Sequence, residues 1–300
     1  MIIVVGGQTA SGKSALALRL ADACDGELVA ADSRQVYAGL TVASAGPTAD
    51  DLRRRRHHLY GAFDPLTTTV TAGMFVAAAD AAIAEIVGRN KTAIVVGGTG
   101  LYLRSLRLGL GPDLPKDEAL RGLLQRDLNV DGLDALVARL RSIDSNAAGA
   151  IDVNNPVRVV RALEIALLGG NAGARDLDAL LRAPPRPVVA AARWYVVEPV
   201  ADGGEAAIVA RTRQMFADGI VEESAALAKR LPPTHPLLST MGTAEALQLH
   251  RGEINLDVAV AMVITRTRQY ARRQRTWFRK ETWWQRVGPE VAVDRLDARS

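Results

Sequence analysis

The chain has 300 residues, of which 48% are hydrophobic and 23% are charged. This composition is ordinary for a folded protein, and the length allows one large or two smaller domains with a sizeable core. The single cysteine, Cys24, excludes an intramolecular disulfide and a cysteine-based zinc site, and it suits a reducing cytoplasm. The apolar opening stretch stops at Gly6 without a preceding basic region, so we expect neither a signal peptide nor a membrane span.

Positive charge is concentrated in two segments of the chain. The net charge is +4, and the arginines at 53–56 form one basic cluster. A second cluster lies in the last third, where residues 265–280 contain many arginines and no acidic residue. A solvated helix face usually mixes both signs of charge, so this segment predicts a polyphosphate partner.

The first third of the chain alternates short apolar runs with helical patterns. Strands are expected at 2–5, 28–31 and 92–96, and helices after residue 12 and at 77–87. This alternation predicts an α/β fold with a parallel sheet that is covered by helices on both faces. Ligands of such folds bind beyond the carboxyl ends of the strands. Gly7, Asp32 and Thr99 follow the three strands, so we expect them to converge on one crevice.

Helical periodicity alone continues from residue 116 to about residue 170. Asn155 followed by Pro156 predicts a helix start, because Asn is a favoured cap and Pro a favoured first residue. The expected apolar stripe of this helix consists of Val160, Leu163 and Leu167. A proline-rich linker and a strand at 194–197 then indicate a return to the sheet. The predicted organisation is a core of residues 1–112 and 188–300, with a helical C-terminal part, and a helical insertion at 113–187.

The residues after the first strand fit the pattern G-x-x-x-x-G-K-[ST]. They are Gly7, Gln8, Thr9, Ala10, Ser11, Gly12, Lys13 and Ser14. Glycines in such a loop let backbone N–H groups point at anionic oxygens, and the following helix N-terminus adds partial positive charge. Lys13 supplies a formal charge, and the Ser14 hydroxyl can ligate Mg²⁺. The pattern predicts a phosphate-binding loop but does not say which phosphate compound binds.

Two further residues are candidates for chemistry at the same crevice. Asp32 could cap the turn that follows it, or act as a base or metal ligand beside the phosphate loop, and its position favours the second role. Thr99 lies in a Gly-Gly-Thr-Gly turn. Its hydroxyl could serve the site, or the segment could be a plain strand-to-helix turn.

Six segments, in chain order, resemble the tRNA dimethylallyltransferase (isopentenyltransferase) family. They are GQTASGKS at 7–14, ADSRQVYAGL at 31–40, VVGGTGLYL at 95–103, NNPVRVVRALEI at 154–165, RTRQMFADGIVEE at 211–223 and TRTRQYARRQRTWFRK at 265–280. Many kinases share the first segment, whereas DSRQVY, VGGTGLY and RRQRTWFR in that order are highly specific. Two stretches depart from the family pattern: Gly46 replaces a usual lysine, and residues 242–245 read GTAE. The zinc finger of eukaryotic members is missing, which fits a bacterial-type protein.

The resemblance implies a P-loop NTPase-like core, a helical insertion and a transfer reaction. Dimethylallyl diphosphate would be the donor, Mg²⁺ would assist, and the acceptor would be the exocyclic amine of the adenosine 3′-adjacent to the anticodon in tRNA. Asp32 would take the proton of that amine, Thr99 would contact the leaving oxygen, and Lys13, Ser14 and Arg211 would hold the diphosphate. The resemblance implies tRNA contact by Asp32, Ser33, Arg34, Gln35, Val157, Arg158, Arg161, Arg268, Arg272, Arg275 and Arg279.

The chemistry of these residue types agrees with that reaction. Departure of diphosphate builds negative charge that fixed cations and N–H donors can stabilise, and a carboxylate can accept the amine proton. A base in an anticodon stem-loop must flip out of its stack to be reached. The alternatives are a small-molecule kinase of the shikimate or gluconate kinase type and a non-catalytic RNA-binding protein. We expect a cytoplasmic monomer, while the set of modified tRNAs is not predicted.

Overall fold

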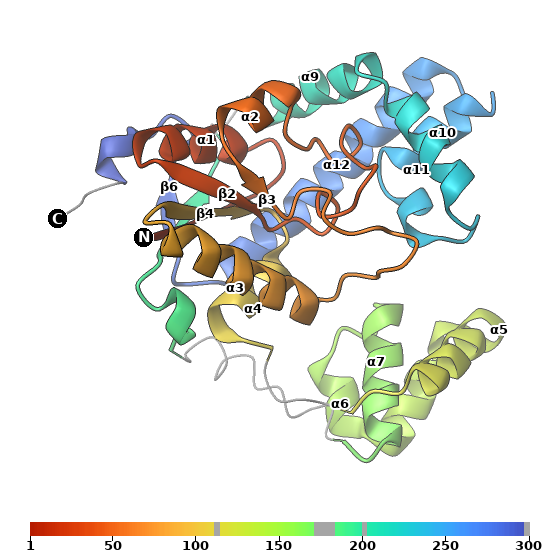
Figure 1. The fold of residues 1–300 in the computed structure, drawn as a ribbon. Helices are drawn as coiled ribbons and strands as arrows, with labels where there is room; N and C mark the ends of the chain where they lie inside the picture. Colours follow the sequence, from red (N-terminus) through yellow and green to blue (C-terminus); the bar gives the residue numbers. More distant parts are fainter. Residues whose placement is uncertain (111–114, 171–183, 200–202, 297–300) are drawn as a thin grey trace. The chain divides into compact units, whose positions relative to one another are not determined.

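The protein divides into two compact units in its computed structural model, which describes residues 1–110, 115–170, 184–199 and 203–296 (Figure 1). The core unit comprises Met1–Gly109 and Pro185–Ser300, and the helical unit comprises Leu110–Pro184. The expected boundaries at 113 and 187 lie three residues from these. Arg186 belongs to the core unit because its side chain donates to Asp80 and its backbone N–H donates to the carbonyl oxygen of Arg107.

A six-stranded parallel sheet with the order β3-β2-β4-β1-β5-β6 forms the centre of the core unit. The strands are β1 (Ile2–Gly7), β2 (Gly26–Ala30), β3 (His57–His58), β4 (Thr92–Gly97), β5 (Arg193–Val197) and β6 (Gln285–Val287). The inner strands are almost wholly buried, which explains their continuous apolar sequence. The predicted α/β class is confirmed. The edge strands β3 and β6 were not predicted, because neither His-His nor Gln-Arg-Val has an apolar pattern.

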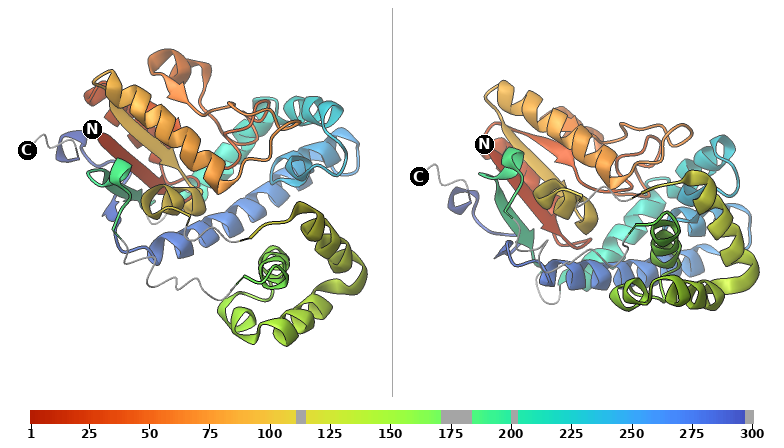
Figure 2. Two further views of the ribbon diagram at one scale, coloured as in Figure 1. Left: turned by 60° about the horizontal axis from the view of Figure 1, so that its bottom comes forward. Right: turned by 90° about the horizontal axis from the view of Figure 1, so that it is seen from below.

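Helices cover both faces of this sheet (Figures 1 and 2). The helices of the core unit are α1 (Lys13–Ala23), α2 (Ala49–Arg54), α3 (Ala72–Gly88), α4 (Gly100–Leu108), α9 (Gly203–Ala217), α10 (Ile220–Arg230), α11 (Thr243–His250) and α12 (Leu256–Arg279), with short 3₁₀ segments at Pro187–Val189, Pro236–Ser239 and Val293–Arg295. One apolar cluster joins α1 to the sheet, and a second joins α3, α4 and the end of α12 to its other face. Helix α3 begins five residues before its predicted start, where the Thr71 hydroxyl accepts from the Met74 N–H.

Helix α12 carries the basic C-terminal segment, and its buried stripe anchors it to the core unit. That stripe consists of Ala259, Val263, Thr267, Ala271, Gln274 and Phe278. Trp283 and Trp284 follow the helix and pack in the same cluster as Phe278. A stripe that is buried along its whole length fixes the rotation of the helix, so each flanking arginine has a defined direction.

The helical unit consists of α5 (Glu118–Ile143), α6 (Ser145–Ala150) and α7 (Pro156–Leu167). Helix α5 is interrupted at Gly132, whose φ is 83°, and Asn155 caps α7 as predicted. Leu167 was predicted to be buried but is 37% exposed, because the buried face centres on residues such as Ala162 and Leu163. Over the described parts of both units, no helix is long and apolar enough to cross a lipid bilayer.

Candidate active site

The loop between β1 and α1 has the backbone of an anion-binding loop. Ala10 and Gly12 adopt left-handed conformations, with φ of 59° and 84°, and these turn the chain into the N-terminus of α1. The Ser11 hydroxyl is buried and has no hydrogen-bond partner among the described residues. A buried polar group without a partner is unusual. The loop therefore offers N–H groups, a helix N-terminus and an unused hydroxyl to an anion.

Two partly buried cations, Lys13 and Arg211, adjoin this loop. The Lys13 ammonium donates to the Gln8 carbonyl oxygen at 3.3 Å, and the Arg211 guanidinium donates to the Thr9 hydroxyl at 2.8 Å. Burial lowers the pKa of Lys13 to about 8, and Arg211 lowers it further while Asp32 opposes the change. Burial also lowers the pKa of Arg211, again against the charge of Asp32. Within the described part of the chain neither cation forms an ion pair, so a polyphosphate is the ligand that would compensate both.

Asp32 and Thr99 are brought together beside these cations. The Ser33 N–H donates to the Thr99 hydroxyl oxygen at 2.9 Å, which joins the turn after β2 to the turn after β4. Asp32 accepts from the Arg34 N–H at 2.9 Å, so it also caps its own turn. The Tyr270 hydroxyl interacts with Thr99, and burial raises the pKa of Tyr270 to about 12. The convergence of Gly7, Asp32 and Thr99 on one place is thus present in the structure.

Gln274 of α12 links the two halves of the site, and nothing in our sequence analysis singled it out. Its amide oxygen accepts from the Thr9 N–H at 2.7 Å, and its amide nitrogen donates to the Gly98 carbonyl oxygen at 2.9 Å. A Cβ atom on Gly98 would lie 2.3 Å from that nitrogen, so only glycine allows this approach. The contact spans 265 residues of sequence. In the sequence, the only sign of this role is that Gln274 is a neutral residue within a basic segment.

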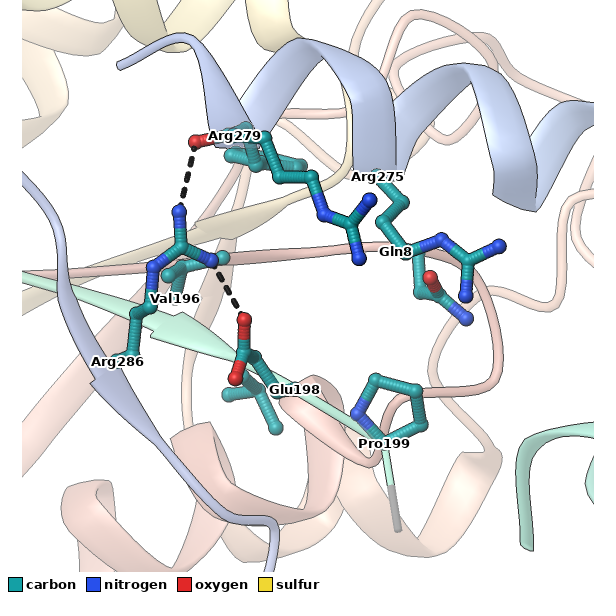
Figure 3. A pocket seen from close by; sticks show the side chains of 9 residues that line it. Gln8, Val196, Glu198, Pro199, Arg275, Arg279 and Arg286 are labelled. Atoms are coloured by element: carbon teal, nitrogen blue, oxygen red, sulfur yellow. Dashed lines mark hydrogen bonds and ion pairs between the residues drawn. The ribbon is translucent and has the colours of Figure 1, made fainter. Parts of the chain in front are cut away.

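A cavity of about 220 Å³ opens beside the start of the phosphate loop (Figure 3). Its lining includes Gln8, Pro199, Phe278 and three arginines, namely Arg275, Arg279 and Arg286. Arg286 is held in place by the Glu198 carboxylate and the Phe278 carbonyl oxygen. Two of the four predicted tRNA-contacting arginines of α12 therefore line a cavity at the phosphate loop.

The family model described as IPP transferase matches residues 35–281. The chain belongs to this family. A tRNA dimethylallyltransferase of Anaeromyxobacter sp. (strain Fw109-5) is 42% identical over 298 residues, which are 99% of this chain and 98% of that protein. A tRNA isopentenylpyrophosphate transferase structure from Bacillus halodurans has a TM-score of 0.67 and 29% identity, covering 98% of this chain and 92% of that one. A eukaryotic dimethylallyltransferase structure has a TM-score of 0.76 at 21% identity, covering 99% and 75%.

The other residues that the IPP transferase resemblance singled out have varied surroundings. Arg268 forms an ion pair with Glu205, whereas Arg272 is exposed. Gln35 donates to the Ser44 and Ala45 carbonyl oxygens, so it holds the segment that leads into Gly46, one of the departures from the family pattern. Among the remaining residues, Arg34, Val157 and Arg158 are exposed and Ser33 is partly buried.

Arg161, an expected tRNA contact, is engaged within the helical unit. In the helical unit its guanidinium donates to the Pro115 carbonyl oxygen and to the buried carboxylate of Glu164. The i, i+3 spacing of Arg161 and Glu164 permits this pair, and the burial of Glu164 makes it a structural contact.

The chemistry of the loop allows a magnesium ion as a partner of the diphosphate. Among the described residues, no three His, Cys, Asp or Glu side chains gather in a way that could hold a metal ion. Mg²⁺ usually binds through one or two protein groups together with phosphate oxygens and water. Ser14, exposed in the first turn of α1, is suited to such a site.

Proposed function

We propose that this IPP transferase moves a dimethylallyl group from dimethylallyl diphosphate to the exocyclic amine of the adenosine 3′-adjacent to the anticodon in tRNA. The observation that carries the proposal is the position of two partly buried cations without an ion-pair partner among the described residues, Lys13 and Arg211, beside Asp32 and Thr99. Relatives of similar length named tRNA dimethylallyltransferase support this reaction over the small-molecule kinase.

The first half of the mechanism concerns the donor. Lys13, Arg211 and the loop N–H groups hold the diphosphate, and the same groups stabilise the negative charge that grows on it as the carbon–oxygen bond breaks. They are fixed before the reaction, because Arg211 is tied to Thr9 and Lys13 to Gln8. When bound, Mg²⁺ at the Ser14 hydroxyl would neutralise part of the diphosphate charge.

The second half concerns the acceptor. The amine nitrogen attacks the allylic carbon, the bond from that carbon to the diphosphate oxygen breaks, and the carboxylate of Asp32 takes the amine proton. Thr99 contacts the leaving oxygen as a donor. Its oxygen accepts from the Ser33 N–H and its hydroxyl contacts Tyr270, so the hydroxyl hydrogen would turn from Tyr270 to the leaving oxygen.

The tRNA must present its adenosine out of the stack to reach Asp32. We propose tRNA contacts through the loop after β2, through the exposed start of α7 and through the basic α12, involving Ser33, Arg34, Gln35, Val157, Arg158, Arg161, Arg268 and Arg272. The structure commits Arg161 to Glu164, which makes Arg158 the freer group of that pair. We propose a cytoplasmic enzyme that works as a monomer.

The test is transfer of labelled dimethylallyl to unmodified tRNA in the presence of Mg²⁺. Wild type should label the tRNA, and Asp32→Ala should be slower by about 10²–10⁴-fold with tRNA binding retained, because general-base catalysis contributes about that much. Asp218→Ala removes an exposed carboxylate elsewhere and serves as the matched control. No label with any tRNA, together with ATP hydrolysis in the presence of small hydroxylated metabolites, would favour the kinase.

A further inference from the structure

The two flanks of α12 face different ends of the active site. On one flank, Tyr270 interacts with Thr99, and Trp277 lies against Gly100, where an added Cβ would come within 2.2 Å of the indole nitrogen. At about 100° per residue, positions 275 and 279 lie roughly half a turn away from these two. Arg275 and Arg279 therefore point away from the acceptor side, and they line the cavity beside Gln8.

We name this space the outer cavity; Gln8, Pro199, Arg275, Phe278, Arg279 and Arg286 contribute to its lining. Figure 3 shows the side chains of Gln8, Arg275 and Arg279 around the same opening, with Arg286 and Glu198 across from them. Three arginines against one carboxylate leave two positive charges. The side chains of Arg275 and Arg279 have no ion-pair or hydrogen-bond partner among the described residues, so their N–H donors are available to a ligand.

The outer cavity is connected to the phosphate loop through a single residue. Gln8 contributes its side chain to the cavity lining, and its carbonyl oxygen accepts from the Lys13 ammonium. A volume of about 220 Å³ corresponds to roughly seven water molecules at about 30 Å³ each, which is the scale of a diphosphate. Guanidinium groups bind phosphate oxygens in a bidentate manner. The dimensions suit a small polyanion better than a stretch of RNA backbone.

We propose that the outer cavity is a second diphosphate-binding site, through which diphosphate passes between solvent and the phosphate loop. The proposal rests on the proposed function, because it assumes that the loop holds a diphosphate. In the loop the anion meets two partly buried cations that form no ion pair among the described residues, whereas in the outer cavity Glu198 offsets one of three exposed arginines. The outer site is therefore the weaker one, as an entry and exit site must be.

The test is calorimetric titration with inorganic diphosphate, with Lys13→Ala used to weaken the loop site. The binding that remains in Lys13→Ala should weaken by about tenfold for each arginine when Arg275→Gln and Arg279→Gln are added, since each removes a charge-assisted hydrogen bond. Arg126→Gln/Arg141→Gln, on α5, removes the same charge from exposed positions and should leave it unchanged. A second titration with dimethylallyl diphosphate, without tRNA, distinguishes an incoming donor from a departing product.

Two outcomes would overturn the proposal. One is unchanged diphosphate affinity when Arg275→Gln/Arg279→Gln is added to Lys13→Ala, and the other is a loss of tRNA affinity without any loss of diphosphate affinity, which would assign these arginines to RNA. If the double variant unfolds, Arg275→Lys/Arg279→Lys keeps the charge and should weaken diphosphate binding by less than about threefold for each arginine. Diphosphate binding needs no turnover. An absence of prenyl transfer in wild type would therefore reject the proposed function and leave this result standing.

Discussion

Partly buried cations occur in both units of the protein, but their surroundings differ. In the core unit, Lys13 and Arg211 lie partly buried at the phosphate loop, and no ion-pair partner of either is found among the described residues. In the helical unit, Arg121 and Arg161 both donate to the fully buried carboxylate of Glu164, which also accepts from the Asp117 N–H at 2.9 Å. Glu164 balances the charges of Arg121 and Arg161 within the chain, whereas the charges of Lys13 and Arg211 remain available to a ligand.

This difference separates a structural charge from a functional one. Burial alone would raise the pKa of Glu164, but the Asp117 N–H and the two guanidinium groups outweigh it and hold that pKa below its usual range. At the phosphate loop the balance goes the other way, and burial lowers the pKa of Lys13 to about 8. A buried charge without a partner destabilises the folded state, so the core unit keeps these groups at a cost that a bound anion offsets.

The largest expected effect comes from removing Glu164, the acceptor that Arg121 and Arg161 share. Glu164→Leu leaves Arg121 and Arg161 without their shared acceptor, and we expect a loss of about 3 kcal/mol of unfolding free energy in the helical unit. Urea denaturation of the full chain, with hydrogen exchange to locate the loss, measures it. Glu118→Leu removes an exposed carboxylate from α5 and should change stability far less. An equal loss of unfolding free energy in Glu164→Leu and Glu118→Leu would mean that the burial of Glu164 does not matter for stability.

Removing an uncompensated charge should have the opposite effect on stability. Lys13→Met should weaken diphosphate binding by about 100-fold, since a hydrogen bond to a charged group contributes about 1.5–3 kcal/mol. The folded pKa of Lys13 lies below its ordinary value of 10.5, so at neutral pH the charge is less favourable in the folded state. Lys13→Met should therefore raise the melting temperature of the ligand-free protein. A lower melting temperature would show that Lys13 is a structural residue.

The sequence was informative where function depends on a local pattern. The loop from Gly7 to Ser14, and the turns at Asp32 and Thr99, could be located because each follows an apolar strand. Contacts between distant segments could not be predicted in this way. Gln274 and the shared acceptor Glu164 were missed, because burial of a polar side chain depends on packing that periodicity does not reveal. Similarly, only the rotation of α12 shows which arginines face the phosphate loop.

Gln274 offers a way to change the site without altering any of its charges. Gln274→Met keeps the volume but loses both hydrogen bonds, to the Thr9 N–H and the Gly98 carbonyl oxygen. We expect kcat to fall by about tenfold, since two neutral hydrogen bonds at about 1 kcal/mol each are lost and the loop shifts relative to Thr99. The KM for tRNA should change little. Gln274→Glu keeps the acceptor and places a carboxylate against the Gly98 carbonyl oxygen, so it should be at least as slow.

In that experiment, a nearly unchanged KM for tRNA distinguishes a residue that positions the site from a residue that contacts the substrate. Gln248→Met, on α11, is a control because Gln248 is partly buried outside the site. If Gln274→Met raised the KM for tRNA and left kcat unchanged, Gln274 would act in RNA binding and not in holding the two turns together.

The smallest expected effect is a pH dependence that tests the uncompensated charge directly. In the free enzyme Lys13 should be protonated below pH 8 and lose its charge above it. Diphosphate binds the protonated form of Lys13. Its affinity for wild type, divided by its affinity for Lys13→Arg at the same pH so that the titration of diphosphate itself cancels, should be constant below about pH 8 and then fall by at most about tenfold per pH unit. Lys13→Arg keeps a charge throughout this range, so it serves as the reference whatever its absolute affinity. A ratio that stays flat to pH 10 would mean that the Lys13 ammonium is compensated as fully as Arg121 and Arg161 are by Glu164, and the contrast between the two units would fail.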